Sequence, residues 1–140
     1  MVLILYPWDN EYDGEFANHC DENCANASWA DRFTHVNENK DDGHAITSPV
    51  GSRPDGAAWV GTMDMSGNLS EWTLSEYIDY PYDAHDGRND NLENTDVLRV
   101  LRGGSLGSLS FLLLSANRSW TNPTDDFITY GFRCAHSYEQ

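Results

Sequence analysis

Residues 9–56 constrain the fold most, because this long stretch shows no sustained hydrophobic period of either a strand or a helix. It is rich in Asn, Asp, Gly and Ser, and residues 79–95 have the same character. Loops of this length in a compact domain are usually functional, or are held by something other than regular secondary structure. The sequence therefore predicts a domain in which short strands are separated by long polar loops.

Short apolar segments predict the positions of these strands. We expect extended segments at residues 2–5, 59–65, 69–76 (with a helix as the alternative), 97–101, 109–116 (buried) and 128–135, and one helical turn at residues 28–33. The glycine pair at 103–104 ends or bends the strand before it. A chain of 140 residues without internal repeats suits one domain, so we expect a single domain over residues 1–140.

The charge balance excludes some partner classes. The chain has 8 Lys plus Arg against 23 Asp plus Glu, a net charge of −15. Nucleic acids and anionic membranes need a cationic face, so neither is an expected partner. No apolar stretch is long enough to span a bilayer, and residues 1–6 lack the basic region of a signal peptide, so the compartment stays open. The acidity serves either solubility or the binding of hard cations such as Ca²⁺.

The chain has three cysteines. An odd number cannot all be paired within the chain, so a full disulfide framework is not expected. Cys20 and Cys24 are close enough for a local disulfide, although a free buried pair is equally compatible with the spacing. Cys134 lies in an apolar run and is predicted to be a small buried hydrophobic residue.

Four segments, in this order, resemble the formylglycine-generating-enzyme family, also called the sulfatase-modifying-factor family. They are Tyr6-Pro7-Trp8, then Asp42-Gly43-His44 with Ser48-Pro49-Val50-Gly51, then Asp64-Met65-Ser66-Gly67-Asn68-Leu69-Ser70-Glu71-Trp72, and finally Arg102-Gly103-Gly104-Ser105 with Ala116-Asn117-Arg118 and Gly131-Phe132-Arg133-Cys134-Ala135. The resemblance implies an α+β, C-type-lectin-like fold with little regular secondary structure and long loops. Family members carry a further segment upstream of Tyr-Pro-Trp. The domain is therefore expected to lack its usual N-terminal part, whose packing a partner chain or a second copy would supply.

The resemblance also implies two calcium sites. The first would use the side chains of Asp64 and Glu71 with the carbonyls of Gly67 and Leu69, and the second the side chains of Asn18 and Asp42 with the carbonyls of His19 and His44. Ca²⁺ accepts such a mixture of carboxylate, amide and backbone oxygens. The alternative for the first set is that its carboxylates only hydrogen-bond the Gly-Asn turn. Bound calcium would neutralise converging carboxylates and hold the acidic loops.

The catalytic residues of the family's enzyme are missing. That enzyme holds copper with two cysteines shortly after Gly-Gly-Ser, and thiolates are the natural ligands of Cu(I). Residues 106–115 contain no cysteine. The prediction leans towards a non-catalytic domain, with a formylglycine-generating-type oxidase, or a pseudoenzyme subunit of one, as the alternative.

The C-terminal part also resembles the variable proteins of diversity-generating retroelements. The shared pattern is Arg102-Gly103-Gly104-Ser105, Ser115-Ala116-Asn117-Arg118 and Gly131-Phe132-Arg133. It implies that a protein or small-molecule ligand binds through the intervening residues Leu106, Gly107, Ser108, Ser110, Phe111, Ser119, Trp120, Thr121, Asn122, Asp125, Thr129 and Tyr130. Phe111, Trp120 and Tyr130 would be the aromatic anchors. If ordinary drift produced this segment instead, Phe111 and Trp120 are expected in the core.

Overall fold

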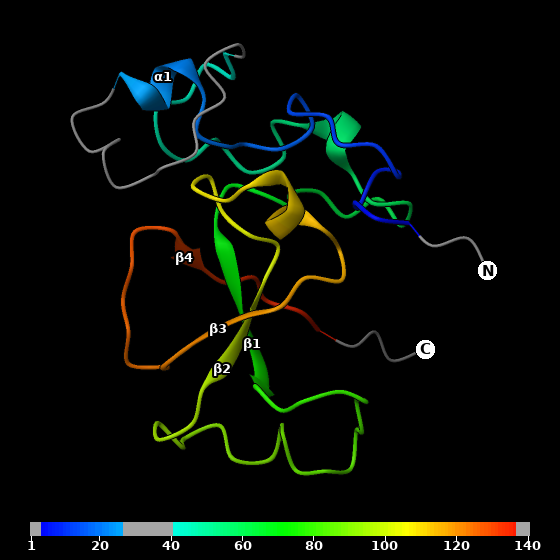
Figure 1. Cartoon of the computed structure of the whole chain (residues 1–140), viewed down its shortest axis with the longest axis vertical. Helices are drawn as coiled ribbons and strands as arrows, with labels where there is room; N and C mark the ends of the chain where they lie inside the picture. The colour runs from blue at the N-terminus through cyan, green and yellow to red at the C-terminus, as the bar shows by residue number, and fades with distance from the viewer. Residues whose placement is uncertain (1–3, 27–40, 137–140) are drawn as a thin grey trace.

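A small mixed β-sheet lies at the centre of the computed structural model, which describes residues 4–26 and 41–136 (Figure 1). Its strands are β1 (Ser70–Glu76), β2 (Arg99–Arg102), β3 (Ser119–Thr121) and β4 (Tyr130–Gly131), in the spatial order β3-β2-β1-β4. β2 pairs antiparallel with both β1 and β3, whereas β4 pairs parallel with β1. The arrangement agrees with the predicted α+β class.

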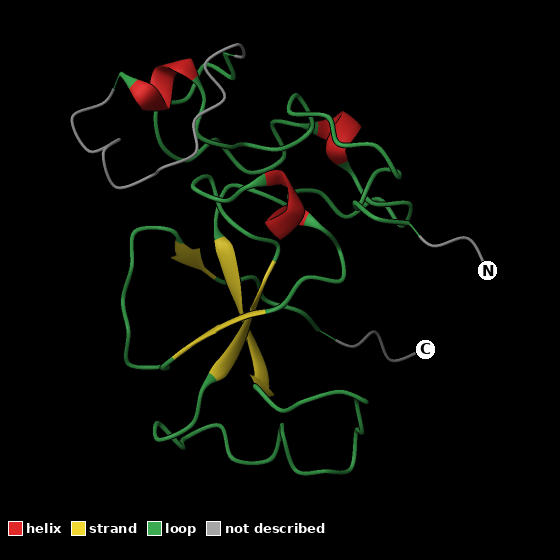
Figure 2. Cartoon of the chain, in the orientation of Figure 1, coloured by secondary structure: helices red, strands yellow, loops and turns green. Residues whose placement is uncertain are grey.

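Helices contribute little beyond single turns. They are the α-helix α1 (Glu22–Ala25) and the 3₁₀ helices η2 (Pro54–Gly56) and η3 (Ser110–Leu113). All three lie among the loops at one end of the sheet, while residues 77–98 form a long loop at the other end (Figure 2). Asp21 caps α1, because its buried carboxylate accepts the backbone N–H groups of Asn23 and Cys24. No helix in the described ranges is both long and apolar enough to cross a bilayer.

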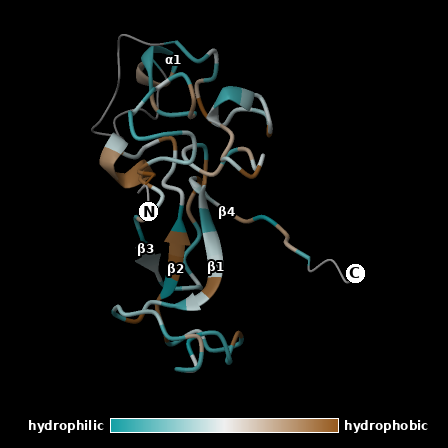
Figure 3. Ribbon diagram, turned by 90° about the vertical axis from the view of Figure 1, so that its right-hand side faces the viewer, coloured by the Kyte–Doolittle hydropathy of each residue, from teal (hydrophilic) through white to brown (hydrophobic). Residues whose placement is uncertain are grey.

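The core consists of two small clusters at the loop end of the sheet. Tyr6, Ala17 and Leu113 form the first cluster, and the second joins Leu106 to Cys20 and Cys24, which form a disulfide. The backbone N–H of Cys20 donates to the Leu106 carbonyl, and the backbone N–H of Leu106 donates to the Asn68 carbonyl. β2 adds Val100 and Leu101 to the buried residues, and it is the most hydrophobic strand in Figure 3. The sequence left the cysteine pairing open, and the structure decides for the disulfide.

Arginine side chains hold the loops to the sheet. Arg99 is buried and donates to the carbonyls of Leu74, Asn91 and Asn94. Arg102 donates to the carbonyls of residues 115–117, and Arg118 donates to the carbonyl of Ile78. A guanidinium carries five donors in a rigid fork, so one side chain can fix several backbone carbonyls that no strand or helix satisfies.

Two of the predicted strands are confirmed and others are wrong. The segments 69–76 and 97–101 correspond to β1 and β2, but 109–116 contains the 3₁₀ helix η3, in which only Leu113 is buried. A short apolar run does not distinguish a strand from a helix, and here Leu113 turns inward to pack beside Tyr6 and Ala17. Residues 59–65 form no strand, and the segment 128–135 keeps only the two residues of β4.

Three further predictions concern segment 2–5, residues 28–33 and Cys134. Ile4 and Leu5 are not in a strand, and the rest of segment 2–5 lies outside the described residues, as does the predicted turn at 28–33. Cys134 is exposed, so its predicted burial is wrong. The reason is that the chain leaves the sheet after β4, and residues 132–136 are all solvent-exposed.

Candidate functional site

The four residues of the first predicted calcium set lie together. Asp64, Gly67, Leu69 and Glu71 line one hollow of about 180 Å³, along with Val50, Asn68, Phe132 and Arg133. They come from the turn before β1 and from β1 itself, which is the arrangement their sequence spacing predicts. The hollow also contains a cation that the prediction did not include.

Arg133 supplies that cation. Its guanidinium reaches both carboxylate oxygens of Glu71, at 2.5 Å from Nε to Oε2 and 2.6 Å from Nη2 to Oε1. It also donates to the carbonyls of Met63 and Asp64, at 3.0 and 2.7 Å. The hydrogen bonds to Glu71 raise the pKa of Arg133. Arg133 thus neutralises Glu71 at the place where the first predicted set would hold a calcium ion.

The second predicted set offers buried oxygens instead. Asn18 is 2% exposed; its Nδ2 donates to the Ile46 carbonyl, whereas its Oδ1 has no donor. The Asp42 side chain is 3% exposed, and its Oδ1 accepts the backbone N–H of His44. Desolvation by burial raises the pKa of Asp42, and the neighbouring carboxylate of Asp21 raises it further. An orphaned amide oxygen and a desolvated carboxylate are chemically suited to a hard cation.

Arg53 is the competing cation at this second set. Its Nη2 lies 2.9 Å from Asp42 Oδ2, an ion pair whose angles are poor for a hydrogen bond. The same side chain donates to the carbonyl of Glu15. Unlike Glu71, Asp42 has only one of its oxygens paired with a guanidinium. His19 is buried with Nδ1 3.1 Å from the Ala17 carbonyl, and its Nε2 has no partner.

The structure brings the two predicted sets into contact. Asn68 donates its backbone N–H to the Asn18 carbonyl at 2.9 Å, and its side chain exchanges two hydrogen bonds with the backbone of Ser48. Within the described ranges, no three His, Cys, Asp or Glu side chains gather as a metal site. As predicted, both sets combine carboxylate oxygens with amide or backbone carbonyl oxygens.

The predicted ligand-binding residues divide into buried and accessible ones. The side chains of Leu106, Thr121 and Thr129 are buried, so the structure corrects the expectation that they contact a ligand. Leu106 packs against the disulfide, and Thr121 donates to Asp125 Oδ2 at 2.6 Å. The partly buried members are Gly107, Ser108, Ser110, Asn122 and Tyr130, and the exposed ones are Phe111, Ser119, Trp120 and Asp125.

The aromatic residues among them are mostly accessible. Phe111 is 56% exposed and Trp120 is 52% exposed, so neither belongs to the core. Trp120 lies on the edge strand β3, with its ring centroid 6.0 Å from that of Tyr77. Tyr130 is held between the rings of Trp72 and Phe127. Phe111 and Trp120 therefore remain available as contact residues.

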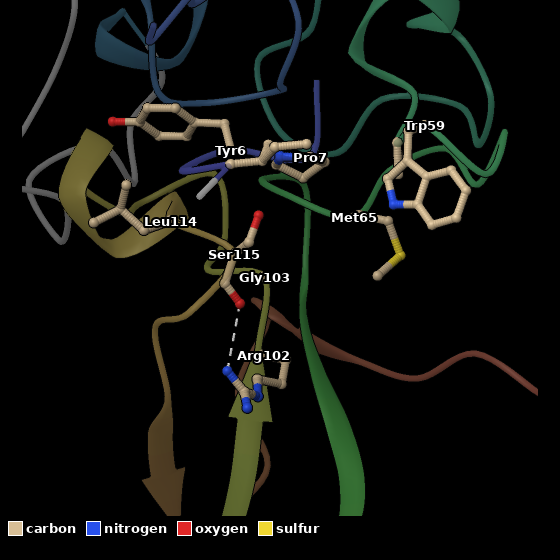
Figure 4. Close-up of a pocket in the computed structure, with 10 residues that line it drawn as sticks. Tyr6, Pro7, Trp59, Met65, Arg102, Gly103, Leu114 and Ser115 are labelled. Carbon is tan, nitrogen blue, oxygen red and sulfur yellow. Dashed lines mark hydrogen bonds between the residues drawn. The ribbon is translucent and has the colours of Figure 1, made fainter. Parts of the chain in front are cut away.

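A pocket that sequence reasoning missed lies where four separate segments meet, residues 4–7, 58–65, 102–103 and 114–115. It has a volume of about 370 Å³ and is lined by Ile4, Tyr6, Pro7, Ala58, Trp59, Met65, Arg102, Gly103, Leu114 and Ser115. Figure 4 shows Tyr6 and Leu114 on one side, Trp59 and Met65 on the other, and Arg102 below them. Trp59 is 85% exposed. The only sequence signal was that the motifs at residues 6–8 and 102–105 both belong to the family pattern. The sequence did not predict that these two motifs lie close together in the fold.

Comparison with known proteins identifies the family. The chain matches the sulfatase-modifying factor enzyme 1-like domain over residues 4–138. It belongs to this family. The family resemblance predicted from the four sequence segments is thus confirmed.

Several known proteins are similar to the chain. The inactive C-alpha-formylglycine-generating enzyme 2 of Bos taurus is 28% identical over 136 residues, covering 94% of this chain and 37% of that protein. The serine/threonine-protein kinase pkn1 of Chlamydia caviae is 41% identical over 91 residues, covering 64% of this chain and 14% of the kinase. Hercynine oxygenase of Mycolicibacterium smegmatis is 32% identical over 94 residues, covering 63% and 22%. The chain thus spans only a minor part of each relative.

Two solved structures are similar to the domain. PvdO from Pseudomonas aeruginosa superposes with a TM-score of 0.53 and 33% identity, covering 65% of this chain and 34% of PvdO. Treponema denticola variable protein 1 gives a TM-score of 0.49 and 24% identity, covering 63% and 31%. The likeness to PvdO supports the family fold for the sheet and its loops.

Proposed function

We propose that this chain is a non-catalytic binding domain of the sulfatase-modifying-factor family, and that it holds an apolar group of its ligand in the pocket beside Trp59. The pocket is the observation that carries the proposal. Its walls are mainly aromatic and aliphatic, and a single guanidinium supplies an oriented polar group, which is the usual composition of a small-molecule site. Leu114 and Ser115 bring part of the region expected to bind ligand, residues 106–130, to this pocket.

The cysteines support the non-catalytic part of the proposal. Two of the three are joined in the Cys20–Cys24 disulfide, which leaves Cys134 as a single thiol. The copper chemistry implied by the family resemblance needs a pair of thiolates. The relative that matches 94% of the chain is itself described as inactive. A formylglycine-generating-type oxidase, alone or as the complex of this chain with an active partner, remains the alternative.

Replacing Trp59 with alanine is expected to weaken the binding of a neutral aromatic probe such as indole at least 10-fold. The indole ring of Trp59 forms one wall of the pocket, and a stacked aromatic pair contributes about 1 kcal/mol beyond the area it buries. Saturation-transfer NMR titrations of the wild-type chain and of W59A would measure the change. Trp120→Ala is the matched control, since it also removes an exposed tryptophan. A loss of binding in W120A but not in W59A would place the ligand on the β3 edge and contradict the proposal.

We further propose that calcium stabilises the buried loops through the second predicted set, Asn18, His19, Asp42 and His44. The orphaned Asn18 Oδ1 and the desolvated Asp42 carboxylate support this assignment. The first set, with Asp64 and Glu71, would bind calcium only if Arg133 moved away. Bound calcium would supply a fixed positive charge between loops that have little regular structure.

Excess calcium is expected to raise the melting temperature by roughly 5–10 °C relative to EGTA, because a ligand at 100 times its dissociation constant adds about 2.7 kcal/mol. Asp42→Asn should abolish most of the shift. Glu71→Gln should leave it intact, since Arg133 already occupies that carboxylate. Asp55→Asn is the control, because it makes the same change at an exposed position. An unchanged melting temperature, or a full shift in D42N, would contradict the assignment.

A display role of the kind found in diversity-generating retroelements is a second candidate. The exposure of Phe111 and Trp120 favours it, because accessible aromatics provide large contact areas at low entropic cost. The gene neighbourhood tests it: a reverse transcriptase beside a near-copy of the gene's 3′ end is expected. Their absence would leave ordinary drift as the explanation of residues 106–130.

A further inference from the structure

A third, smaller hollow gathers three of the eight Lys and Arg side chains of this acidic chain. It has a volume of about 90 Å³ and is lined by Thr73, Ser75, Tyr80, Tyr82, Arg88, Val100, Arg102 and Arg118. Thr73 and Ser75 come from β1, where its pairing with β2 is irregular between Trp72 and Glu76, and Val100 and Arg102 come from β2. The long loop 77–98 supplies the tyrosines and Arg88. The hollow is therefore built on rigid strands and closed by that loop.

Two of its three guanidinium charges have no carboxylate partner. Arg102 donates to the carbonyls of residues 115–117 and to the hydroxyl of Tyr80, and Arg118 donates only to the carbonyl of Ile78. Among the described residues no Asp or Glu lies within ion-pair distance of either guanidinium, whereas Arg88 pairs with Asp86. In a chain with a net charge of −15, carboxylates are abundant, so two converging cations without one form a local anion-attracting field.

Aromatic rings fix the direction of these guanidinium groups. Arg118 lies over the rings of Tyr77 and Tyr80, at 4.6 and 4.2 Å from its Cζ to the ring centroids. Arg88 lies over the ring of Tyr82 at 4.6 Å. Stacking of this kind holds the planar group while leaving its edge free to donate. The donors are thus positioned before any ligand arrives, which lowers the entropic cost of binding.

The tyrosine hydroxyls add donors of the right kind. The Tyr80 hydroxyl accepts from Arg102 at 3.5 Å, and the Tyr82 hydroxyl accepts from Asn89 at 3.3 Å. A phenolic hydroxyl that accepts in this way still has its own proton to donate. Neither proton has an acceptor among the hydrogen bonds of the described residues. The hollow thus offers hydrogen-bond donors from two guanidinium groups and two hydroxyls. Such a set suits a ligand whose polar atoms only accept hydrogen bonds.

We propose that this hollow binds a tetrahedral oxyanion, a phosphate or sulfate group, through Arg102, Arg118 and the hydroxyls of Tyr80 and Tyr82. Oxyanions accept hydrogen bonds from paired guanidinium N–H groups with good geometry, and such charge-assisted bonds are about twice as strong as neutral ones. The site is separate from the proposed pocket beside Trp59, although Arg102 lines both. It stands even if the Trp59 pocket binds nothing.

Titration of the full chain with inorganic sulfate and phosphate at constant ionic strength, followed by NMR, tests the proposal. Arg118→Gln is expected to weaken binding at least 10-fold, and Arg118→Lys less, because lysine keeps the charge but loses the planar fork. Tyr82→Phe removes only one O–H group and should weaken binding about threefold, the equivalent of roughly one neutral hydrogen bond. Since Y82F changes a single oxygen, it keeps the test valid if R118Q fails to fold.

Arg53→Gln is the matched control, because it removes an arginine that does not line the hollow. Equal weakening of anion binding by R53Q and R118Q would overturn the proposal, because the effect would then follow from the net charge of the chain alone. Sulfate binding no tighter than chloride binding would overturn it for the same reason. Phenyl phosphate identifies the source of the anion. If it binds more tightly than inorganic phosphate, the hollow recognises an anionic group on a larger ligand; equal binding indicates the free anion.

Discussion

Replacing Gly67 with alanine is expected to lower the free energy of unfolding by about 4 kcal/mol, the sum of a left-handed backbone and a severe clash. Gly67 has φ = +80°, and a Cβ at this position would lie 2.5 Å from the Asn18 carbonyl oxygen. That oxygen accepts the Asn68 N–H, so the clash also breaks the contact between the two predicted calcium sets. Urea unfolding followed by tryptophan fluorescence would measure the loss.

Gly61→Ala separates the two causes of this loss. Gly61 has nearly the same backbone angle, φ = +83°, but nothing lies within 4 Å of its Cβ position. Only the conformational cost should therefore remain, about 1–2 kcal/mol. If G61A and G67A were equally destabilised, the close approach of Gly67 to Asn18 would not contribute to stability.

Replacing Arg99 with methionine is expected to lower the free energy of unfolding by about 3 kcal/mol, since the hydrogen bonds of one buried guanidinium to three carbonyls are lost, each worth on the order of 1 kcal/mol. Arg99 is 4% exposed and holds the carbonyls of Leu74, Asn91 and Asn94. Its side chain thereby ties the loop 77–98 to β1. Differential scanning calorimetry and urea unfolding would both report the change.

Two further variants make the Arg99 result interpretable. Arg99→Lys keeps the charge but can reach fewer of the three carbonyls, so about half of the loss is expected. Arg118→Met should cost about 1 kcal/mol, because among the described residues its guanidinium donates to one carbonyl, that of Ile78, rather than to three. A loss in R118M as large as that in R99M would show that the number of carbonyls held does not decide the loss.

The candidate sites differ in how much of each could be predicted from the sequence. The four residues of the first predicted calcium set lie together, because they belong to one turn and the start of β1. The pairing of Glu71 with Arg133 was not predicted, since Arg133 is 62 positions away in the sequence. Arg102 and Arg118 bind backbone carbonyls. Their convergence with Tyr80 and Tyr82 in one hollow was not expected.

The sequence by itself determined the family, the acidic character, the long loops and the strands β1 and β2. Those features depend on residue type and on local spacing, and local spacing is carried along the chain. The tertiary structure alone decided which distant segments meet: Tyr6 and Trp59 around one pocket, Arg133 with Glu71, and Leu113 turned inward while Phe111 remains exposed. The physical reason is that burial and ion pairing depend on the groups that folding brings within a few ångströms, and positions far apart in a loop-rich chain carry no periodic signal that predicts them.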